Sequence, residues 1–279
     1  MQKKFDDPRP LGFPVYNVQI GQAPLQSARH GFQWTRMKES TVTLPVPGSP
    51  MDLHCFLPDT PPKGRLPAII IIQEAFGVNP HIKRLCRRVA EEGYAVFSPE
   101  LYHRSGSGLE FGYDEFPKIR PILADVTNAM FLDDMQAAHG LISQRADVDP
   151  KRIATWGFCL GGWVSMLCAC KLPIAAAVSF YGGGMVNPRP GFGFTPIIDQ
   201  FASISCPVLL VYGGQDKGIP PEDIAAVQSR LASLGKTHEV EIYPDAGHGF
   251  FCEDRPAYHR ESAEAAWAMA TKWLAAELG

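Results

Sequence analysis

Three side chains that together support nucleophilic catalysis follow three separate predicted strands of this 279-residue chain. Cys159 occupies the centre of "GFCLGGW", Asp216 follows "VLLVYGGQ", and His248 lies in "DAGHGF". A thiol attacks a carbonyl carbon only as a thiolate, so it needs a base beside it and a third group that fixes the base. Open parallel sheets place their ligands at the carboxyl ends of strands, where these residues are expected to meet. The sequence therefore predicts Cys159 as nucleophile, His248 as base and Asp216 as the acid.

The pattern around Cys159 matches the Gly-x-nucleophile-x-Gly arrangement of the nucleophile elbow, a sharp turn from strand to helix. Such a turn strains the backbone at the nucleophile, and Gly157 and Gly161 let strand and helix approach because they lack a Cβ atom. Gly162 is expected to serve the same packing. The N-terminus of the following helix would stabilise a thiolate. The alternative is a small buried cysteine in a glycine-rich turn, because short motifs often occur by chance.

The acid and the base also have alternatives. Asp216 precedes Gly and Pro residues and fits a simple turn, and His248 fits an ordinary loop flanked by glycines. The chain order nucleophile, acid, histidine is that of α/β-hydrolases and favours the catalytic interpretation. Asp245 is a rival for orienting His248, but it lies only three residues away in the same loop, which makes Asp216 the better candidate.

Glu74 lies just after the apolar segment "AIIII", on the loop that supplies one amide of the oxyanion hole in this fold. The backbone N–H groups of Ala75 and Leu160 are therefore the predicted oxyanion donors. Because glutamate is usually exposed, an ordinary loop residue is the alternative for Glu74. The functional interpretation is that Glu74 helps to control the proton of Cys159.

The segments that must position these residues alternate between strand and helix. Strands are predicted over 41–46, 51–57, 66–72, 94–99, 152–158, 173–182, 206–216 and 238–243, and helices over 80–92, 121–145, the residues after 159, 220–235 and 255–278. The first two strands form a hairpin, and the segment 66–72 is apolar throughout, as expected for a strand buried on both faces. Asn79 and Pro80 start a helix that Gly93 ends.

This alternation predicts an α/β protein with the α/β-hydrolase fold, in which a mostly parallel central sheet has helices on both faces. Residues 1–38 are rich in Pro, Gly, Gln and Arg and are predicted to form a partly irregular N-terminal arm. Residues 39–279 are predicted to form the hydrolase domain.

Composition limits the functions to consider. The formal net charge is −3 and no Lys/Arg run occurs, which argues against a nucleic-acid partner. The apolar run 68–72 is too short to cross a bilayer, and the first residues lack the apolar core of a signal peptide. Seven cysteines without a CxxC pair favour a reduced, cytoplasmic protein without structural zinc. We expect a small-molecule substrate, no cofactor, no metal, and a monomer or weak dimer.

Five segments in series, "QEAFGVN", "SPELYHR", "GFCLGGW", "GGQDKGIP" and "AGHGF", resemble the dienelactone hydrolase (carboxymethylenebutenolidase) family over residues 40–278. The resemblance implies one α/β-hydrolase domain, a Cys-His-Asp triad, no cofactor, and hydrolysis of an enol-lactone to maleylacetate. It implies that Glu74 meets the cysteine in the resting enzyme and that Arg104 binds a substrate carboxylate. Tyr102 and Phe76 join Arg104 in the predicted substrate-binding set.

The chain departs from the family pattern at two places. Cys252 stands where the family has a second carboxylate-binding arginine, and Arg255, three residues further on, is the candidate replacement. The segment 182–205 is long and carries Phe192, Phe194 and Phe201. A packed surface loop is the slightly favoured interpretation of this segment, and an aromatic wall or lid over the pocket is the alternative.

These observations predict a hydrolase that cleaves a lactone or activated ester through a thioester at Cys159. In the empty site the thiol is expected to point toward Glu74, and a substrate carboxylate on Arg104 would release it. The alternatives are a carboxylesterase or thioesterase with a neutral substrate, and a non-catalytic lactone-binding relative. A redox-sensing thiol is a further alternative, but Cys168 and Cys170, in the same predicted helix, are expected to face the core rather than Cys159.

Overall fold

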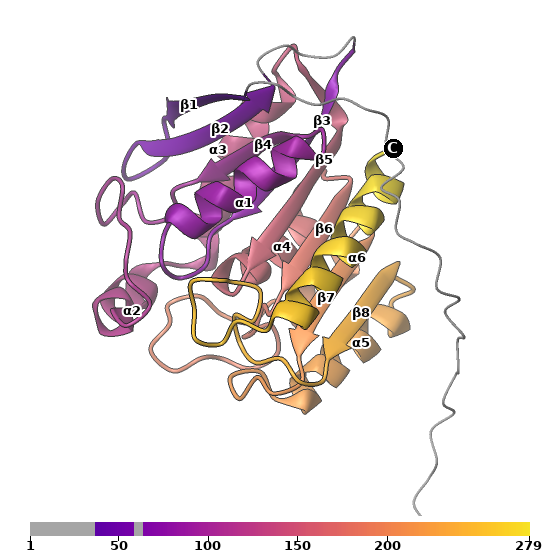
Figure 1. Ribbon diagram of the computed structural model, residues 1–279. Helices are drawn as coiled ribbons and strands as arrows, with labels where there is room; N and C mark the ends of the chain where they lie inside the picture. The colour runs from indigo at the N-terminus through magenta and orange to yellow at the C-terminus, as the bar shows by residue number, and fades with distance from the viewer. Residues whose placement is uncertain (1–36, 59–63) are drawn as a thin grey trace, which may run out of the picture. The chain divides into compact units, whose positions relative to one another are not determined.

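The computed structural model of the protein describes residues 37–58 and 64–279, and within them one sheet of eight strands forms the centre of the fold (Figure 1). The strands are β1 (Met37–Leu44), β2 (Met51–Pro58), β3 (Leu66–Ile72), β4 (Ala95–Pro99), β5 (Val148–Phe158), β6 (Ala176–Phe180), β7 (Val208–Gly213) and β8 (His238–Tyr243). Their order in the sheet is β1-β2-β4-β3-β5-β6-β7-β8. β2 is antiparallel to β1 and to β4, and the six strands from β4 to β8 are parallel.

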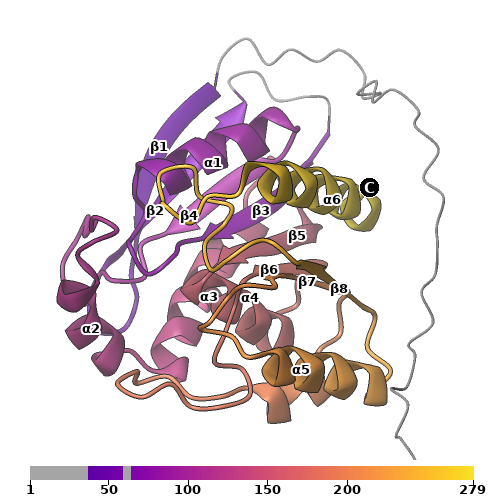
Figure 2. The ribbon, with the colours of Figure 1, turned by 60° about the horizontal axis from the view of Figure 1, so that its bottom comes forward.

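Helices cover both faces of this sheet. They are α1 (Pro80–Glu91), α2 (Phe116–Asp125), α3 (Asn128–Ser143), α4 (Leu160–Lys171), the 3₁₀ helix η1 (Ile198–Ser203), α5 (Pro221–Ser233) and α6 (Arg260–Leu278). Figure 2 shows α1 and α6 on one face and α3, α4 and α5 on the other. The predicted α/β-hydrolase architecture, a mostly parallel sheet between two helical layers, is confirmed.

Local sequence signals explain where several elements begin and end. The Asn79 side chain accepts a hydrogen bond from the Ile82 N–H (3.1 Å), and Pro80 is the first residue of α1, as predicted. Gly93 has φ +100°, which a glycine adopts without strain, so the chain leaves the helix there. The predicted hairpin is formed by β1 and β2, although β1 begins at Met37. The predicted arm, residues 1–38, lies almost entirely outside the described residues.

The single helix predicted over 121–145 is wrong, because two helices occupy this region. Val126 is extended (ψ 137°) and ends α2, and the Thr127 side chain then caps α3 by accepting a hydrogen bond from the Met130 N–H (3.3 Å). A threonine cap satisfies one of the free N–H groups at a helix start, so it favours a new helix at this point. The last helix likewise begins at Arg260 rather than 255, with His259 as its cap.

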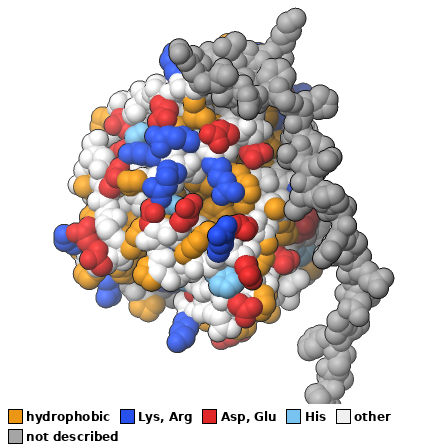
Figure 3. Space-filling model, in the orientation of Figure 1, with side chains coloured by type: hydrophobic (Ala, Val, Ile, Leu, Met, Phe, Trp, Pro, Cys, Tyr) orange, Lys and Arg blue, Asp and Glu red, His pale blue; other side chains and the backbone are white. Residues whose placement is uncertain are grey.

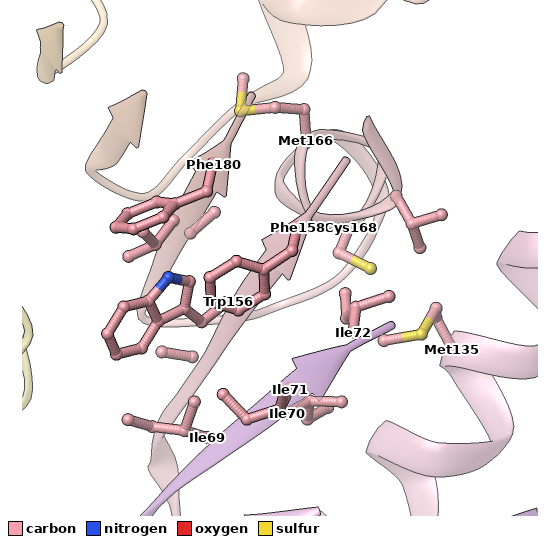
Figure 4. Packing of buried hydrophobic residues seen from close by; sticks show 14 of the residues in the cluster. Ile69, Ile70, Ile71, Ile72, Met135, Trp156, Phe158, Met166, Cys168 and Phe180 are labelled. Atoms are coloured by element: carbon pink, nitrogen blue, oxygen red, sulfur yellow. The ribbon is translucent and has the colours of Figure 1, made fainter. Parts of the chain in front are cut away.

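The core lies where β3, β5 and β6 pack against the helices on either side. Figure 4 shows Ile69–Ile72 of β3 beside Trp156 and Phe158 of β5 and Phe180 of β6, all fully buried. Burying one such side chain contributes about 1.5–3 kcal/mol to folding. These central strands are therefore a firm support for the turns that follow them, where the candidate catalytic residues lie.

The outer surface mixes charges of both signs. Figure 3 shows basic and acidic side chains intermingled on the face turned to the viewer. Three basic residues of α1 form ion pairs: Lys83 with Glu110, Arg84 with Asp254, and Arg87 with Glu39. In the described part of the chain, no helix combines the length and the apolar character needed to span a membrane.

Candidate active site

The turn between β5 and α4 holds Cys159 in a strained conformation, with φ 54° and ψ −112°. Positive φ in a non-glycine residue costs free energy and persists only where the surroundings enforce it. Here the neighbours are glycines by necessity. A Cβ atom on Gly157 would overlap the carbonyl of Gly161, and one on Gly161 would overlap the carbonyl of Ile72. A Cβ on Gly162 would lie 2.8 Å from a carbonyl oxygen of β6. The turn therefore has the close strand-to-helix packing that the motif predicts.

The ring of His248 links the other two predicted triad residues. Its Nδ1 lies 2.7 Å from Asp216 Oδ2, and its Nε2 lies 3.1 Å from Cys159 Sγ. The Asp216 side chain is fully buried, and its other oxygen accepts a hydrogen bond from the Gly218 N–H (2.8 Å). Asp216, from the loop after β7, and not the alternative Asp245, is thus the carboxylate that contacts His248. The fold therefore joins the three residues in one chain of contacts, with His248 within hydrogen-bonding distance of both Cys159 and Asp216.

The electrostatics of this cluster favour a thiolate beside an imidazolium. Burial opposes the Cys159 thiolate, but the charge and the hydrogen bond of His248 overcome it and lower the pKa of the thiol. Burial likewise opposes the imidazolium, yet the Cys159 sulfur and the Asp216 carboxylate raise the pKa of His248 to about 10. Because each charge stabilises the other, the contact with His248 favours ionisation of the Cys159 thiol.

Glu74 is completely buried and binds an arginine rather than Cys159. Its Oε1 accepts a hydrogen bond from Arg255 Nη1 (3.2 Å). Burial raises the pKa of Glu74, while the nearby charges of Arg255 and His248 act in the opposite direction. The Arg255 guanidinium also lies 5.4 Å from the ring centre of Phe76 and 5.7 Å from that of Tyr113. The expected contact between Glu74 and the Cys159 thiol is replaced here by a Cys159–His248 contact.

Both residues that carry the predicted oxyanion donors border the same cavity as Cys159. Leu160 is the first residue of α4, so its N–H has no acceptor within the helix, and Ala75 borders the same cavity. The Tyr102 hydroxyl donates a hydrogen bond to the Ala75 carbonyl (2.9 Å). Tyr102 is buried and does not border the cavity, so the structure gives it a contact with the backbone rather than the predicted contact with substrate.

The prediction that Arg104 binds a substrate carboxylate is not supported by its position. Its guanidinium pairs with the buried Asp134 of α3 (2.7 Å) and donates to the Pro47 carbonyl (3.0 Å). Asp134 also accepts a hydrogen bond from His103 (3.0 Å), and Arg104 does not border the cavity at Cys159. The sequence could not reveal this because Asp134 lies on a distant helix.

A cavity of about 410 Å³ opens over the sulfur. Its walls are largely apolar and come from the turn after β3, from α2 and from the segment 182–205: Ala75, Phe76, Phe116, Leu123, Phe192 and Phe194. Phe192 and Phe194 stack with ring centres 5.3 Å apart, which fits the aromatic-wall alternative for this segment. Phe201, in contrast, is fully buried in the core.

Two further cations, Arg189 and Lys217, border the cavity, and no pattern in the sequence indicated either of them. Arg189 donates to the Gly218 carbonyl (2.8 Å) and has no carboxylate partner among the residues described. Arg255, the predicted replacement for the missing second arginine, also borders the cavity. Arg255 could be predicted because its position after His248 is close to that of the arginine in the family pattern. Arg189 lies in an irregular segment whose path no local pattern predicts.

One group of side chains in the described residues has the composition of a metal site. His81, Cys252 and Asp254 place one ligand atom each within 4.8 Å of one another. Two of these groups already have partners, since the Cys252 sulfur lies 3.1 Å from the Tyr113 hydroxyl and Asp254 pairs with Arg84 (2.6 Å). Burial and the charge of Arg84 lower the pKa of His81 to about 4. An ion at this place would have to compete with the Tyr113 hydroxyl for Cys252 and with the Arg84 guanidinium for Asp254.

Comparisons with sequences and solved structures show the family of this chain. A profile of the Dienelactone hydrolase family matches residues 52–278. A Synechocystis protein named "Putative carboxymethylenebutenolidase" is 32% identical over 85% of this chain and 97% of its own length. An Escherichia coli protein of the same name is 36% identical over 76% of this chain and 77% of its own. The crystal structure of a "Putative Dienelactone Hydrolase" from Klebsiella pneumoniae superposes with a TM-score of 0.77 at 31% identity, covering 86% of this chain and 99% of that one.

Proposed function

The chain belongs to the dienelactone hydrolase family and is a hydrolase of lactone or ester bonds, and from this premise we propose that Cys159, His248 and Asp216 are its catalytic triad. The observation that carries the proposal is the position of the His248 ring, with one nitrogen 3.1 Å from the sulfur and the other 2.7 Å from the carboxylate. A base held in this way can keep the thiolate ready and return a proton to the leaving group.

The reaction follows from these contacts. The Cys159 thiolate attacks the carbonyl carbon of the ester, and the negative charge moves to the carbonyl oxygen, facing the Ala75 and Leu160 N–H groups. As the tetrahedral species collapses, the C–O bond to the leaving alkoxide breaks and His248 Nε2 gives that oxygen its proton. The product of this step is a thioester on Cys159. His248, now neutral, takes a proton from water, the hydroxide attacks the thioester, and the thiolate leaves beside an imidazolium again.

Glu74 and Arg255 act on this cycle through charge. The Glu74 carboxylate opposes the thiolate and raises the pKa of Cys159, whereas Arg255 lowers it. Because the two are paired, their effects on the sulfur partly cancel. We propose that Glu74 sets how readily Cys159 ionises, without holding the thiol directly. A substrate anion that competed for Arg255 would weaken the pair and so couple binding to the ionisation of the nucleophile.

The cavity supports a substrate with an apolar body and one anionic group. Its aromatic walls suit an unsaturated or aromatic acyl chain, and Arg189 is a cation near Cys159 without a carboxylate partner in the described residues. An acidic lactone fits this combination. The second candidate is a neutral activated ester, because apolar side chains make up most of the wall.

The triad is tested by trapping the acyl-enzyme. With p-nitrophenyl acetate, the wild-type protein should release a burst of nitrophenol, and mass spectrometry should locate one acetyl group on the peptide that contains Cys159. Cys159→Ala should show neither burst nor acetylation. Cys206→Ala removes a buried cysteine outside the cavity and serves as the control that keeps both. Ester turnover by Cys159→Ala at the wild-type rate would refute the proposal.

A further inference from the structure

Gln73, the residue after β3, is buried with 1% of its surface exposed and makes polar contacts on three sides. Its side-chain oxygen accepts a hydrogen bond from the Leu101 N–H (3.1 Å), and its side-chain nitrogen donates to the Glu74 carbonyl (3.3 Å). Its own carbonyl accepts a hydrogen bond from the Gly161 N–H (3.0 Å). A backbone N–H can only donate, so the contact with Leu101 fixes which end of the amide faces Glu74.

One of these contacts fixes the first oxyanion donor. The Glu74 carbonyl and the Ala75 N–H belong to the same planar trans peptide, in which they point in opposite directions. Holding the carbonyl toward the Gln73 amide therefore turns the Ala75 N–H the other way, and Ala75 borders the cavity over Cys159. The next peptide is held as well, because the Tyr102 hydroxyl donates to the Ala75 carbonyl (2.9 Å).

Another contact fixes the second donor. Gly161 follows Leu160 in the first turn of α4, and its N–H is bound to the Gln73 carbonyl. The absence of a side chain on Gly161 is required here, because a Cβ atom would lie 2.6 Å from that carbonyl oxygen. The start of α4 thus rests directly on the backbone of Gln73, which sets how far Leu160 lies from Ala75.

We propose that Gln73 is the positioning residue of the oxyanion hole, which aims the Ala75 amide and fixes its separation from the Leu160 amide. The inference rests on the proposed function, since it presumes that these amides stabilise charge during acyl transfer. Gln73 touches neither substrate nor sulfur. It holds both donor-bearing segments from one buried point and is anchored in turn to Leu101, in the turn after β4, the strand next to β3.

Gln73→Leu keeps the apolar bulk and removes both side-chain hydrogen bonds. Loss of an oxyanion donor typically costs 10²–10³-fold in kcat, so misaiming one is expected to lower kcat for ester hydrolysis about 10- to 100-fold with little change in KM. Alkylation of Cys159 by iodoacetamide forms no oxyanion and should proceed at the wild-type rate. Ser165→Ala, which removes a buried hydrogen bond to Thr155 (2.7 Å), is the control for lost stability and should leave both rates unchanged.

Gln73→Glu provides a second, conservative test. A glutamate retains the acceptor for Leu101 but can donate to the Glu74 carbonyl only when protonated. Burial raises a carboxyl pKa, so the ratio of Gln73→Glu to wild-type kcat should rise as the pH falls. The rate of Cys159 alkylation in Gln73→Glu, measured over the same pH range, accounts for any shift in the thiol pKa. A kcat ratio that merely follows the alkylation ratio would contradict the positioning role.

The outcomes separate this inference from the proposed function. Gln73→Leu with near wild-type kcat, or with alkylation and hydrolysis reduced by the same factor, would overturn the role of Gln73. Full hydrolysis by Cys159→Ala would instead overturn the triad itself.

Discussion

Two buried aspartates among the described residues each bind a histidine ring, and only one of these pairs faces a thiol. His248 lies 2.7 Å from Asp216, and His103 lies 3.0 Å from Asp134. Both carboxylates are completely buried. In the first pair the second ring nitrogen faces Cys159, whereas in the second pair it is buried without a hydrogen-bond partner among residues 37–58 and 64–279. The carboxylate of the second pair also carries Arg104.

The difference shows that a His–Asp contact by itself says little about chemistry. The His248 pair borders a cavity and polarises a thiol. The His103 pair is closed off, and its carboxylate is neutralised by an arginine. A buried ion pair of this kind costs desolvation and is strongly felt when one partner is lost. The His103–Asp134–Arg104 cluster is therefore expected to tie α3 to the turn after β4 without taking part in catalysis.

The largest expected effect is a difference in activity between variants of His248 and of His103. His248→Gln should lower kcat/KM for an activated ester by about 10⁴-fold, since it removes the proposed base and proton donor. His103→Gln should leave kcat/KM per folded molecule unchanged. Steady-state kinetics with the folded fraction measured by circular dichroism would test this. Comparable activity losses in the two variants would abolish the distinction between the pairs.

The same comparison predicts the reverse order for stability. Asp134→Asn leaves the Arg104 guanidinium without its charge partner and should reduce the free energy of unfolding by about 3–5 kcal/mol. Asp216→Asn is expected to cost less stability but to lower kcat by about 10³–10⁴-fold, because the amide favours the wrong tautomer of His248. Urea titrations paired with ester kinetics give both quantities. An Asp134→Asn protein as stable as wild type would contradict the structural role of the second pair.

The pH dependence sharpens the account of the first pair. Thiolate reactivity is lost as the pH falls through the lowered pKa of Cys159, and ester turnover is lost as the pH rises through the His248 pKa of about 10. Because the Glu74 carboxylate raises the pKa of Cys159, Glu74→Gln should move the midpoint of iodoacetamide labelling to lower pH. Glu100→Gln alters a carboxylate bound to His54 and is the control that leaves the midpoint in place. A midpoint that moves upward in Glu74→Gln would contradict the role given to this carboxylate.

The parts of the site that the sequence predicted are those fixed by local rules. The strained turn at Cys159 requires glycine at fixed positions, and the alternation of strand and helix places Asp216 and His248 at strand ends. The fold class follows from the same periodicity and is confirmed. The break between α2 and α3 depends on a single capping residue, Thr127. The residues on both sides of it follow a helical pattern, so the periodicity of the sequence did not reveal the break.

The substrate side of the site depends on contacts between distant segments. Arg104 matched a motif, yet its direction is decided by Asp134, thirty residues later on α3. Arg189 borders the cavity and lies in the segment 182–205. This segment has no periodic pattern, so the sequence could not predict where Arg189 lies. Glu74 was placed near the nucleophile, but its partner Arg255 comes from the other end of the domain.

The smallest expected effect distinguishes two arginines: Arg104, which binds the carboxylate of the His103–Asp134 pair, and Arg189, which borders the cavity. Arg189→Met should raise KM for an acidic lactone about 10-fold, because a charge-assisted contact of roughly 1.5 kcal/mol is lost, and should leave KM for a neutral ester unchanged. Arg104→Met should lower stability through Asp134 without altering the preference between acidic and neutral substrates. If Arg104→Met removes the acid preference and Arg189→Met does not, the second pair would extend to substrate binding, and the separation between the two His–Asp pairs would fail.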